Sequence, residues 1–339
     1  MTSVHRAASL LVAAGAIAIA SGSAGAAAEV MPAATPPLEL VSTIPMPGVQ
    51  GRIDHLAADP AHHRLFVAAL GNDTVEVLDT ASRRGASVRG LGAPQGVLFL
   101  PESNRLIIAN GGANRMDIVD AASLRVVGRI DGLEDADNVR FDAAARTVLV
   151  GYGKGALRIV DAASGQSGGD IALPGHPESF QLERRGSRAF VNVPSSHSIF
   201  VVDRTKRVAV ARWATPDAAQ NFPMALDEDG DRLFVGARSP PVVLVYDTGS
   251  GKVMARLAIG RDTDDLFFDA ARNRLYVICG EGRVDVFQRD DGDRYVRKAS
   301  VGTASRARTG LFVPDEGALY VAAPALGDAP ARILVYRVH

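Results

Sequence analysis

The chain has 339 residues, of which 47% are hydrophobic and 22% charged, and its 37 Lys and Arg against 38 Asp and Glu give a formal net charge of −1. Without a basic surplus there is no broad surface to neutralise phosphates, which argues against a nucleic-acid partner. The single cysteine, Cys279, excludes an internal disulfide. Because it ends a predicted strand, we expect a buried, unreactive thiol.

The first 28 residues have the pattern of a secretory signal peptide. Arg6 supplies a basic start, residues 7–20 form an apolar run, and small residues at 24–28 offer a cleavage site. The run is too short and alanine-rich for a stable membrane span, although an uncleaved anchor is the alternative. We therefore expect a periplasmic or secreted protein with a lead-in linker at 29–37, one domain at 38–339 and no membrane span after cleavage.

A sequence repeat of apolar strands separated by turns occurs seven times between residues 38 and 339. The second strands of the copies begin at Leu65, Leu106, Val148, Ala189, Leu233, Leu275 and Leu319, a period of 41 to 44 residues. This period, with alternating apolar and polar residues, is typical of a β-propeller in which each repeat forms a four-stranded blade. A helical repeat would instead place apolar residues every three to four positions. The sequence predicts an all-β, seven-bladed propeller.

The first full repeat shows the strands of one blade. Residues 56–58 end the inner strand, and residues 65–69 and 75–78 form the second and third strands, with Asp- and Gly-containing turns between them. A fourth, outer strand follows in each later repeat except the last, where the chain stops. The missing strand matches residues 38–44. We expect this N-terminal strand to complete the seventh blade and close the ring, which removes an open sheet edge.

Two repeats carry a recognisable pair of strand motifs. Leu-Phe-Val-Ala at 65–68 precedes Thr-Val-Glu-Val-Leu-Asp at 74–79, and Leu-Ile-Ile-Ala-Asn at 106–110 precedes Met-Asp-Ile-Val-Asp at 116–120. These segments resemble the YVTN-type (YncE-like) seven-bladed propellers of bacteria over about residues 38–339. The resemblance implies the fold but no single function, because such propellers host binding, scaffolding and enzymatic roles. Some members are described as DNA-binding, which this chain's charge does not support.

One position in each repeat departs from the generic pattern. It lies eleven residues before the second strand, at the start of the inner strand, and is occupied by Asp54, Gln95, Asp137, Glu178, Phe222, Asp264 and Arg308. Four of these seven residues are acids. Neighbouring positions add further polar residues, among them Arg52, His55, Asn138, His176, Asn221 and Asp265. Since all inner strands start at the same face of a propeller, we expect these side chains to converge at the mouth of the central channel.

Such a collar of acids needs compensation. Two carboxylates 4 Å apart repel by about 1 kcal/mol in water and about 4 kcal/mol at an effective dielectric constant of about 20. Arginine partners, protonation or a bound cation can relieve the repulsion. A calcium ion suits the carboxylates, and histidine favours a transition metal. The candidate metal ligands are Asp54, His55, Asp137, Glu178 and Asp264, and the candidate ligand-binding residues are Arg52, Gln95, Asn138, His176, Asn221, Asp265 and Arg308. A hydrated mouth without a ligand is the alternative.

Three functions stay open on the sequence. The favoured one is an exported monomeric propeller that binds a small or cationic ligand, or a protein segment, at the channel mouth. The second is a metal-dependent hydrolase of the lactonase type, with His55 or Asp54 as the base. The third is a non-catalytic interaction scaffold. Motifs of serine hydrolases, zinc proteases and phosphate-binding loops do not occur. No cofactor is indicated, so a dehydrogenase is a weaker option, and whether the protein is an enzyme is left open.

Overall fold

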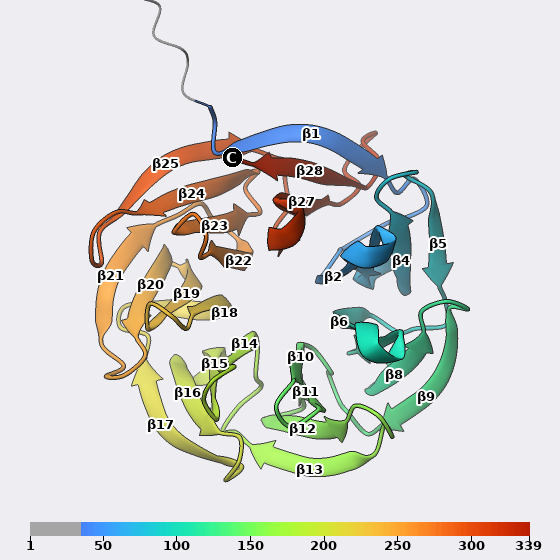
Figure 1. Cartoon of the computed structure of the whole chain (residues 1–339), viewed down its shortest axis with the longest axis horizontal. Coiled ribbons are helices and arrows are strands. Elements are labelled where there is room, and N and C mark those ends of the chain that lie inside the picture. The colour runs from blue at the N-terminus through green and yellow to red at the C-terminus, as the bar shows by residue number, and fades with distance from the viewer. Residues whose placement is uncertain (1–34) are drawn as a thin grey trace, which may run out of the picture. The chain divides into compact units, whose positions relative to one another are not determined.

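The computed structural model describes residues 35–339, which form a ring of seven four-stranded antiparallel sheets (Figure 1). The predicted all-β, seven-bladed propeller is therefore confirmed. The predicted signal peptide and most of the lead-in linker lie outside the described residues. Within residues 35–339, the helices are short 3-10 turns, and none is long and apolar enough to cross a membrane.

Within a blade, successive strands run from the channel outward. The first four blades are β2 (Leu56–Asp59), β3 (Arg64–Ala69), β4 (Thr74–Asp79) and β5 (Gly85–Val88); β6 (Pro94–Leu100), β7 (Arg105–Asn110), β8 (Arg115–Asp120) and β9 (Arg125–Asp131); β10 (Val139–Asp142), β11 (Thr147–Tyr152), β12 (Ala156–Asp161) and β13 (Ser167–Ala172); β14 (Phe180–Leu182), β15 (Arg188–Val193), β16 (Ser198–Asp203) and β17 (Val208–Ala214). The last three are β18 (Ala219–Asp227), β19 (Arg232–Ser239), β20 (Pro241–Asp247) and β21 (Val253–Ala258); β22 (Thr263–Asp269), β23 (Arg274–Cys279), β24 (Arg283–Arg289) and β25 (Tyr295–Gly302); and β26 (Thr309–Val313), β27 (Ala318–Ala323), β28 (Arg332–Val338) and β1 (Leu38–Pro45).

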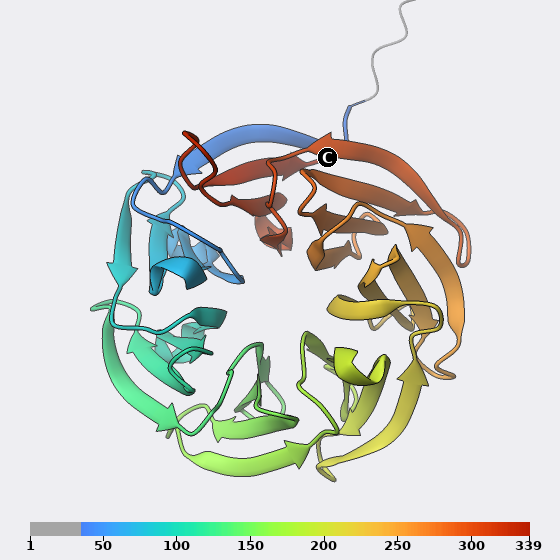
Figure 2. The same ribbon diagram turned by 180° about the vertical axis from the view of Figure 1, so that it is seen from behind.

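The seventh blade joins the two ends of the ring. Strand β1 pairs antiparallel with β28, with Leu38 opposite Val338 and Ile44 opposite Ile333. Figure 2 shows this strand from behind, lying along the outer side of the blade that contains the C-terminus. Leu38 and Ile44 are 2% and 1% exposed, so the strand contributes to the core as well as to the hydrogen bonding. The predicted closure by the N-terminal strand is confirmed.

The core lies between neighbouring blades. Alternate residues of each strand face the adjacent sheet, so β-branched, leucine and aromatic side chains from two blades interdigitate. Phe66 stacks on Phe99 of the next blade with 5.4 Å between ring centroids, and Phe234 on Phe268 with 5.0 Å. Cys279 belongs to this core, and its burial raises the pKa of the thiol to about 12. The Cys279 thiol therefore stays protonated and unreactive at neutral pH.

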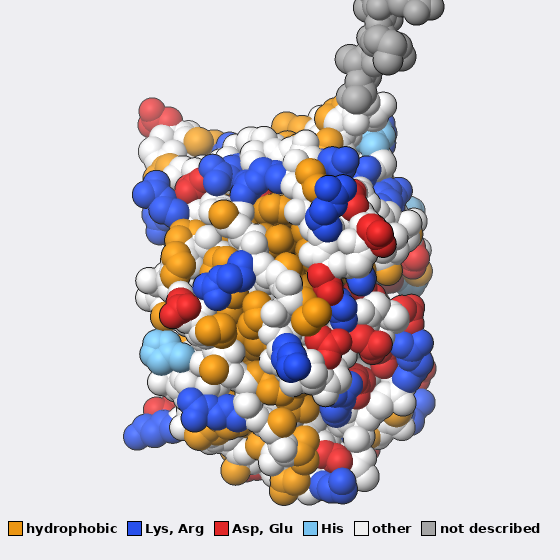
Figure 3. Space-filling view, turned by 90° about the vertical axis from the view of Figure 1, so that its left-hand side faces the viewer, with side chains coloured by type: hydrophobic (Ala, Val, Ile, Leu, Met, Phe, Trp, Pro, Cys, Tyr) orange, Lys and Arg blue, Asp and Glu red, His pale blue; other side chains and the backbone are white. Residues whose placement is uncertain are grey.

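The outer strands expose their second face at the rim of the ring. Exposed apolar side chains there include Val208 and Val210 of β17 and Met254 of β21. Figure 3 views the ring from this side and shows apolar side chains mixed with basic and acidic ones. Each blade is thus covered on its flanks by neighbours, while its inner strand faces the channel.

Candidate functional site at the channel mouth

A repeated backbone turn directs side chains into the mouth. We call the position occupied by Asp54, Asp137, Glu178 and Asp264 in four of the blades the acid position. Two residues before it, the backbone is left-handed in five blades, with φ between 44° and 66°, at Ala93, Asp135, Gln220, Asp262 and Arg306. The inner strand then pairs with the second strand of its blade. The backbone amides at the acid position donate to the carbonyls of Ala68 from Asp54, of Gly151 from Asp137 and of Asn192 from Glu178. The acids are therefore placed by rigid sheet ends.

The four acids Asp54, Asp137, Glu178 and Asp264 come together around the axis. One guanidinium nitrogen of Arg52 lies 2.8 Å from Asp54 and 3.8 Å from Asp264. On the other side, Glu178 and Asp137 share a cluster with His176 in which one candidate ligand atom of each lies within 4.8 Å of the others. The collar consists of two parts with different chemistry.

The first part, on blades one, five, six and seven, is a network of arginine–carboxylate pairs. Nη2 of Arg238 lies 2.6 Å from Oδ1 of Asp264, and Nε of Arg308 lies 3.0 Å from Oδ2 of the same carboxyl group. Burial raises the pKa of Asp264 above its ordinary value, although these arginines oppose the shift. Because Asp54 and Asp264 already have arginine partners, the geometry does not favour them as metal ligands.

Arg238 was not among the residues that the sequence singled out. It lies near the end of the second strand of blade five, β19, while the acid position of that blade is occupied by Phe222. Its guanidinium lies over the Phe222 ring, 4.3 Å from the centroid, and donates from Nε to the carbonyl of Thr263 at 2.8 Å. The signal available in the sequence was Phe222, an aromatic residue at the position where four other blades carry an acid, because an aromatic ring attracts a cation over its face.

His55 crosses the channel between the two parts. Its Nδ1 lies 3.3 Å from Asp265 of blade six, and its Nε2 lies 3.3 Å from the amide nitrogen of Asn138 of blade three and 3.6 Å from Asp54. Burial opposes protonation of the ring, but the carboxylates of Asp265 and Asp54 outweigh it and raise the pKa of His55 to about 10. His55 is therefore a cation at neutral pH when no metal is bound, which argues against a role as a general base, and both of its ring nitrogens already face carboxylates.

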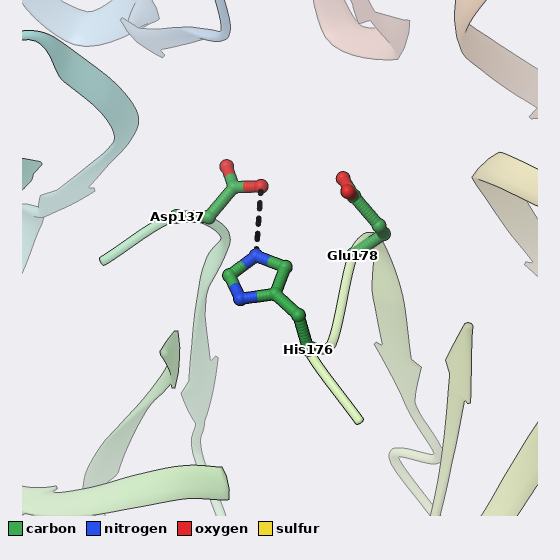
Figure 4. Close-up of side chains that lie close together, drawn as sticks. All are labelled: Asp137, His176 and Glu178. Atoms are coloured by element: carbon green, nitrogen blue, oxygen red, sulfur yellow. Dashed lines mark ion pairs between the residues drawn. The ribbon is translucent and has the colours of Figure 1, made fainter. Parts of the chain in front are cut away.

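The second part of the collar is the cluster of Asp137, His176 and Glu178 on blades three and four (Figure 4). Nδ1 of His176 donates to the carbonyl of Gly153 at 2.7 Å, which turns Nε2 toward Asp137, 4.0 Å from its Oδ2. Figure 4 shows the Glu178 carboxyl group directed into the same space. A backbone partner on the second nitrogen is how proteins orient a metal-binding histidine.

The charges of this cluster are unevenly shared. Burial and the neighbouring Asp137 raise the pKa of Glu178 to about 8. Burial acts against the charge of Asp137 as well, but His176, His55 and Arg52 outweigh it and hold the pKa of Asp137 below its usual range. Asp137 is thus the anion of the pair, and Glu178 keeps a proton up to neutral pH when no cation is bound.

The remaining predicted residues lie at the edge of the site or outside it. Gln95 donates to Asp135 at 3.2 Å, on the rim of the mouth. Asn221 is fully buried and donates to Oδ1 of Asn192 and to the carbonyl of Ser198, so it joins blades four and five rather than facing the mouth. Asn221 is linked to the collar only indirectly among the described residues, through Asn192, whose carbonyl accepts from the Glu178 amide.

Comparisons with known proteins give the fold. No family model matches this chain, and no curated protein sequence matches it significantly. Among solved structures, a chain of the Kuenenia stuttgartiensis hydrazine synthase is similar over 81% of this chain and 94% of its own, with a TM-score of 0.72 and 16% identity. A chain of a mitotic checkpoint complex is similar over 96% of this chain and 99% of its own, with a TM-score of 0.76 and 13% identity. At these identities, the likeness establishes a seven-bladed propeller and nothing about activity.

Proposed function

We propose that the protein is an exported propeller that binds a divalent transition-metal ion at its channel mouth and, through that ion, a small ligand. The observation that carries the proposal is the cluster of Asp137, His176 and Glu178, whose candidate ligand atoms lie within 4.8 Å of one another. One imidazole and two carboxylates suit a transition metal better than calcium, whose sites consist of oxygen ligands.

Electrostatics supports a cation at this position. Without one, the two carboxyl groups of the cluster cannot both ionise at low cost, and Glu178 retains a proton. A divalent ion would displace that proton, together with the one held by His176, whose pKa is raised to about 9, and would neutralise both carboxylates. The arginines of the opposite part are already paired with Asp54 and Asp264, so they do not compete for Asp137 and Glu178.

The second candidate function is a metal-dependent hydrolase of the lactonase type. The number of protein ligands favours it, since three ligands leave coordination positions for a water molecule and a carbonyl oxygen. In this case, a panel of lactones would be hydrolysed by the metal-loaded protein and not by a Glu178→Gln variant. Hydrolysis that persists in that variant would remove this candidate.

The binding proposal is tested with tag-free protein that has been treated with a chelator and dialysed. Zn²⁺, Mn²⁺ and Ca²⁺ are added separately, and unfolding is followed by differential scanning calorimetry. We expect saturable stabilisation by Zn²⁺ or Mn²⁺, of about 2.7 kcal/mol at a metal concentration a hundred times the Kd. His176→Ala and Glu178→Gln should lose this stabilisation.

His197→Asn is the matched control, because His197 is exposed on a blade-four loop and its left-handed backbone suits asparagine. The control should respond to metal like the wild-type protein. A wild-type protein indifferent to all three ions, or a His176→Ala variant that is stabilised as strongly as the wild type, would contradict the proposal.

A further inference from the structure

A second polar space lies inside the ring, farther along the inner strands than the acid collar. It is a cavity of about 220 Å³, and the residues that line it include His55, Arg140, Gln181, Asp265, Phe267 and Leu311. Arg140 and Gln181 each follow the acid position of their blade by three residues, after Asp137 and Glu178. The cavity therefore borders the collar through His55 and extends away from the metal-binding cluster.

Arg140 enters this cavity without a carboxylate partner. Its Nη1 donates to the carbonyl of Val139 at 2.8 Å, its Nη2 reaches Oγ of Ser179 only at 3.5 Å, and its guanidinium lies over the Phe180 ring. No ion pair joins it to any acid of residues 35–339, whereas Arg52, Arg238 and Arg308 each have one. A guanidinium carries five N–H donors, so most of those of Arg140 have no protein acceptor.

The cavity carries a net positive charge. Asp265 is already satisfied, because its Oδ1 lies 3.3 Å from His55 and its Oδ2 accepts a hydrogen bond from the Gly310 amide at 2.9 Å. Burial lowers the pKa of Arg140 below its ordinary value, although the more distant charges of Asp265 and Asp137 oppose the shift. Since His55 and Asp265 are paired with each other, the guanidinium of Arg140 is the charge in the lining of the cavity that lacks a counter-ion, and one monovalent anion would balance it.

We propose that this cavity binds a small organic carboxylate, whose carboxylate group pairs with Arg140 and whose apolar part packs on Phe267 and Leu311. Arginine matches a carboxylate with two parallel hydrogen bonds. The volume corresponds to about seven water molecules at roughly 30 Å³ each, enough for an acid of four or five carbons. Phe267 and Leu311 disfavour phosphate and sulfate, because oxygens of these anions that face the two apolar side chains would be left unpaired.

The test uses the full metal-free protein in chloride buffer with EDTA, so the result does not depend on metal binding at the mouth. Sodium butyrate and sodium phosphate are titrated separately, and binding is measured by isothermal titration calorimetry. We expect saturable butyrate binding by the wild type and at least about a tenfold weaker affinity in Arg140→Gln, because a charge-assisted pair is lost. Arg158→Gln, whose arginine pairs with Asp170 in the same blade outside the cavity, is the matched control and should bind like the wild type.

A further variant keeps the test independent of the stability of Arg140→Gln. Leu311→Phe leaves every charge in place but fills the cavity, and it should abolish butyrate binding. No saturable binding by the wild type, or unchanged affinity in both variants, would overturn the proposal. Phosphate binding as tight as butyrate binding would overturn the assignment to carboxylates.

Discussion

Replacing His55 with glutamine tests whether a buried imidazolium stabilises the centre of the ring. Glutamine can still hydrogen-bond to Asp265 but carries no charge. Because the pKa of His55 is raised in the folded state from 6.5 to about 10, its contribution to stability is complete below about pH 6.5. That contribution is lost as the pH rises through 10. The variant should therefore be less stable than the wild type at neutral pH and nearly as stable above pH 10.

The structure sets the size of this effect. The shift from 6.5 to about 10, at about 1.4 kcal/mol per unit, gives a ceiling of about 5 kcal/mol. The imidazole is 19% exposed, and solvent screening and local relaxation reduce the figure. We expect a loss of about 2 kcal/mol in the free energy of unfolding at pH 7 and under about 0.5 kcal/mol at pH 10.5.

Urea denaturation at both pH values, in the presence of EDTA, measures the difference between the two proteins. The wild type alone is no test, because Asp54, Glu178 and His176, with pKa values raised to about 7, about 8 and about 9, titrate in the same range. His197→Asn serves as the control and should be pH-independent relative to the wild type. A destabilisation of equal size at pH 7 and pH 10.5 would show that packing, not charge, is what His55 provides.

The closure strand, the arginine network and the core thiol can each be tested by a substitution or a chemical modification. Ile44→Asp should lower the free energy of unfolding by about 3 kcal/mol or more and cause aggregation, measured by light scattering, because it detaches β1 from β28. Leu40, on the same strand, is 52% exposed, so Leu40→Asp should have neither effect. Equal effects of the two substitutions would refute the role of β1 in closing the ring. Arg238→Gln should lower the free energy of unfolding, measured in urea, by about 1–3 kcal/mol. The reason is that Asp264 loses the closer of these two arginine partners, 2.6 Å away against 3.0 Å for Arg308. Arg185→Gln, 66% exposed, should have little effect, and a similar loss in both would contradict this role. Cys279 should resist iodoacetamide at pH 8 in the native state by mass spectrometry; modification within minutes would show that the blade is not closed around it.

The fold could be predicted because its information is periodic. The second strand of each repeat begins 41 to 44 residues after the second strand of the preceding repeat. The pairing of residues 38–44 with the final blade follows from the absence of a fourth strand in the last repeat. The same periodicity identifies the start of every inner strand. That is why Asp54, Asp137, Glu178 and Asp264 could be expected at one mouth from the sequence alone.

The division of the collar could not be predicted in this way, because it depends on contacts between blades. Arg238 reaches Asp264 from the end of a second strand, outside the register of inner strands. Asn221 lies one residue before the register position of its blade and just before an irregularity in the pairing of β18 with β19, and its side chain turns between the blades. His176 becomes a candidate metal ligand only through the carbonyl of Gly153, which belongs to the neighbouring blade.

The pairing of β1 with β28 has a consequence for how the protein is made. Leu38 of β1 pairs with Val338 of β28, which follows 300 residues later in the chain, so β1 leaves the ribosome long before its partner has been made. Until β28 has been made, β1 and the open edge of the incomplete ring stay unpaired and can associate with other chains. A truncated translation product could not complete its last blade. The unfinished chain is therefore most prone to association before β28 has been made.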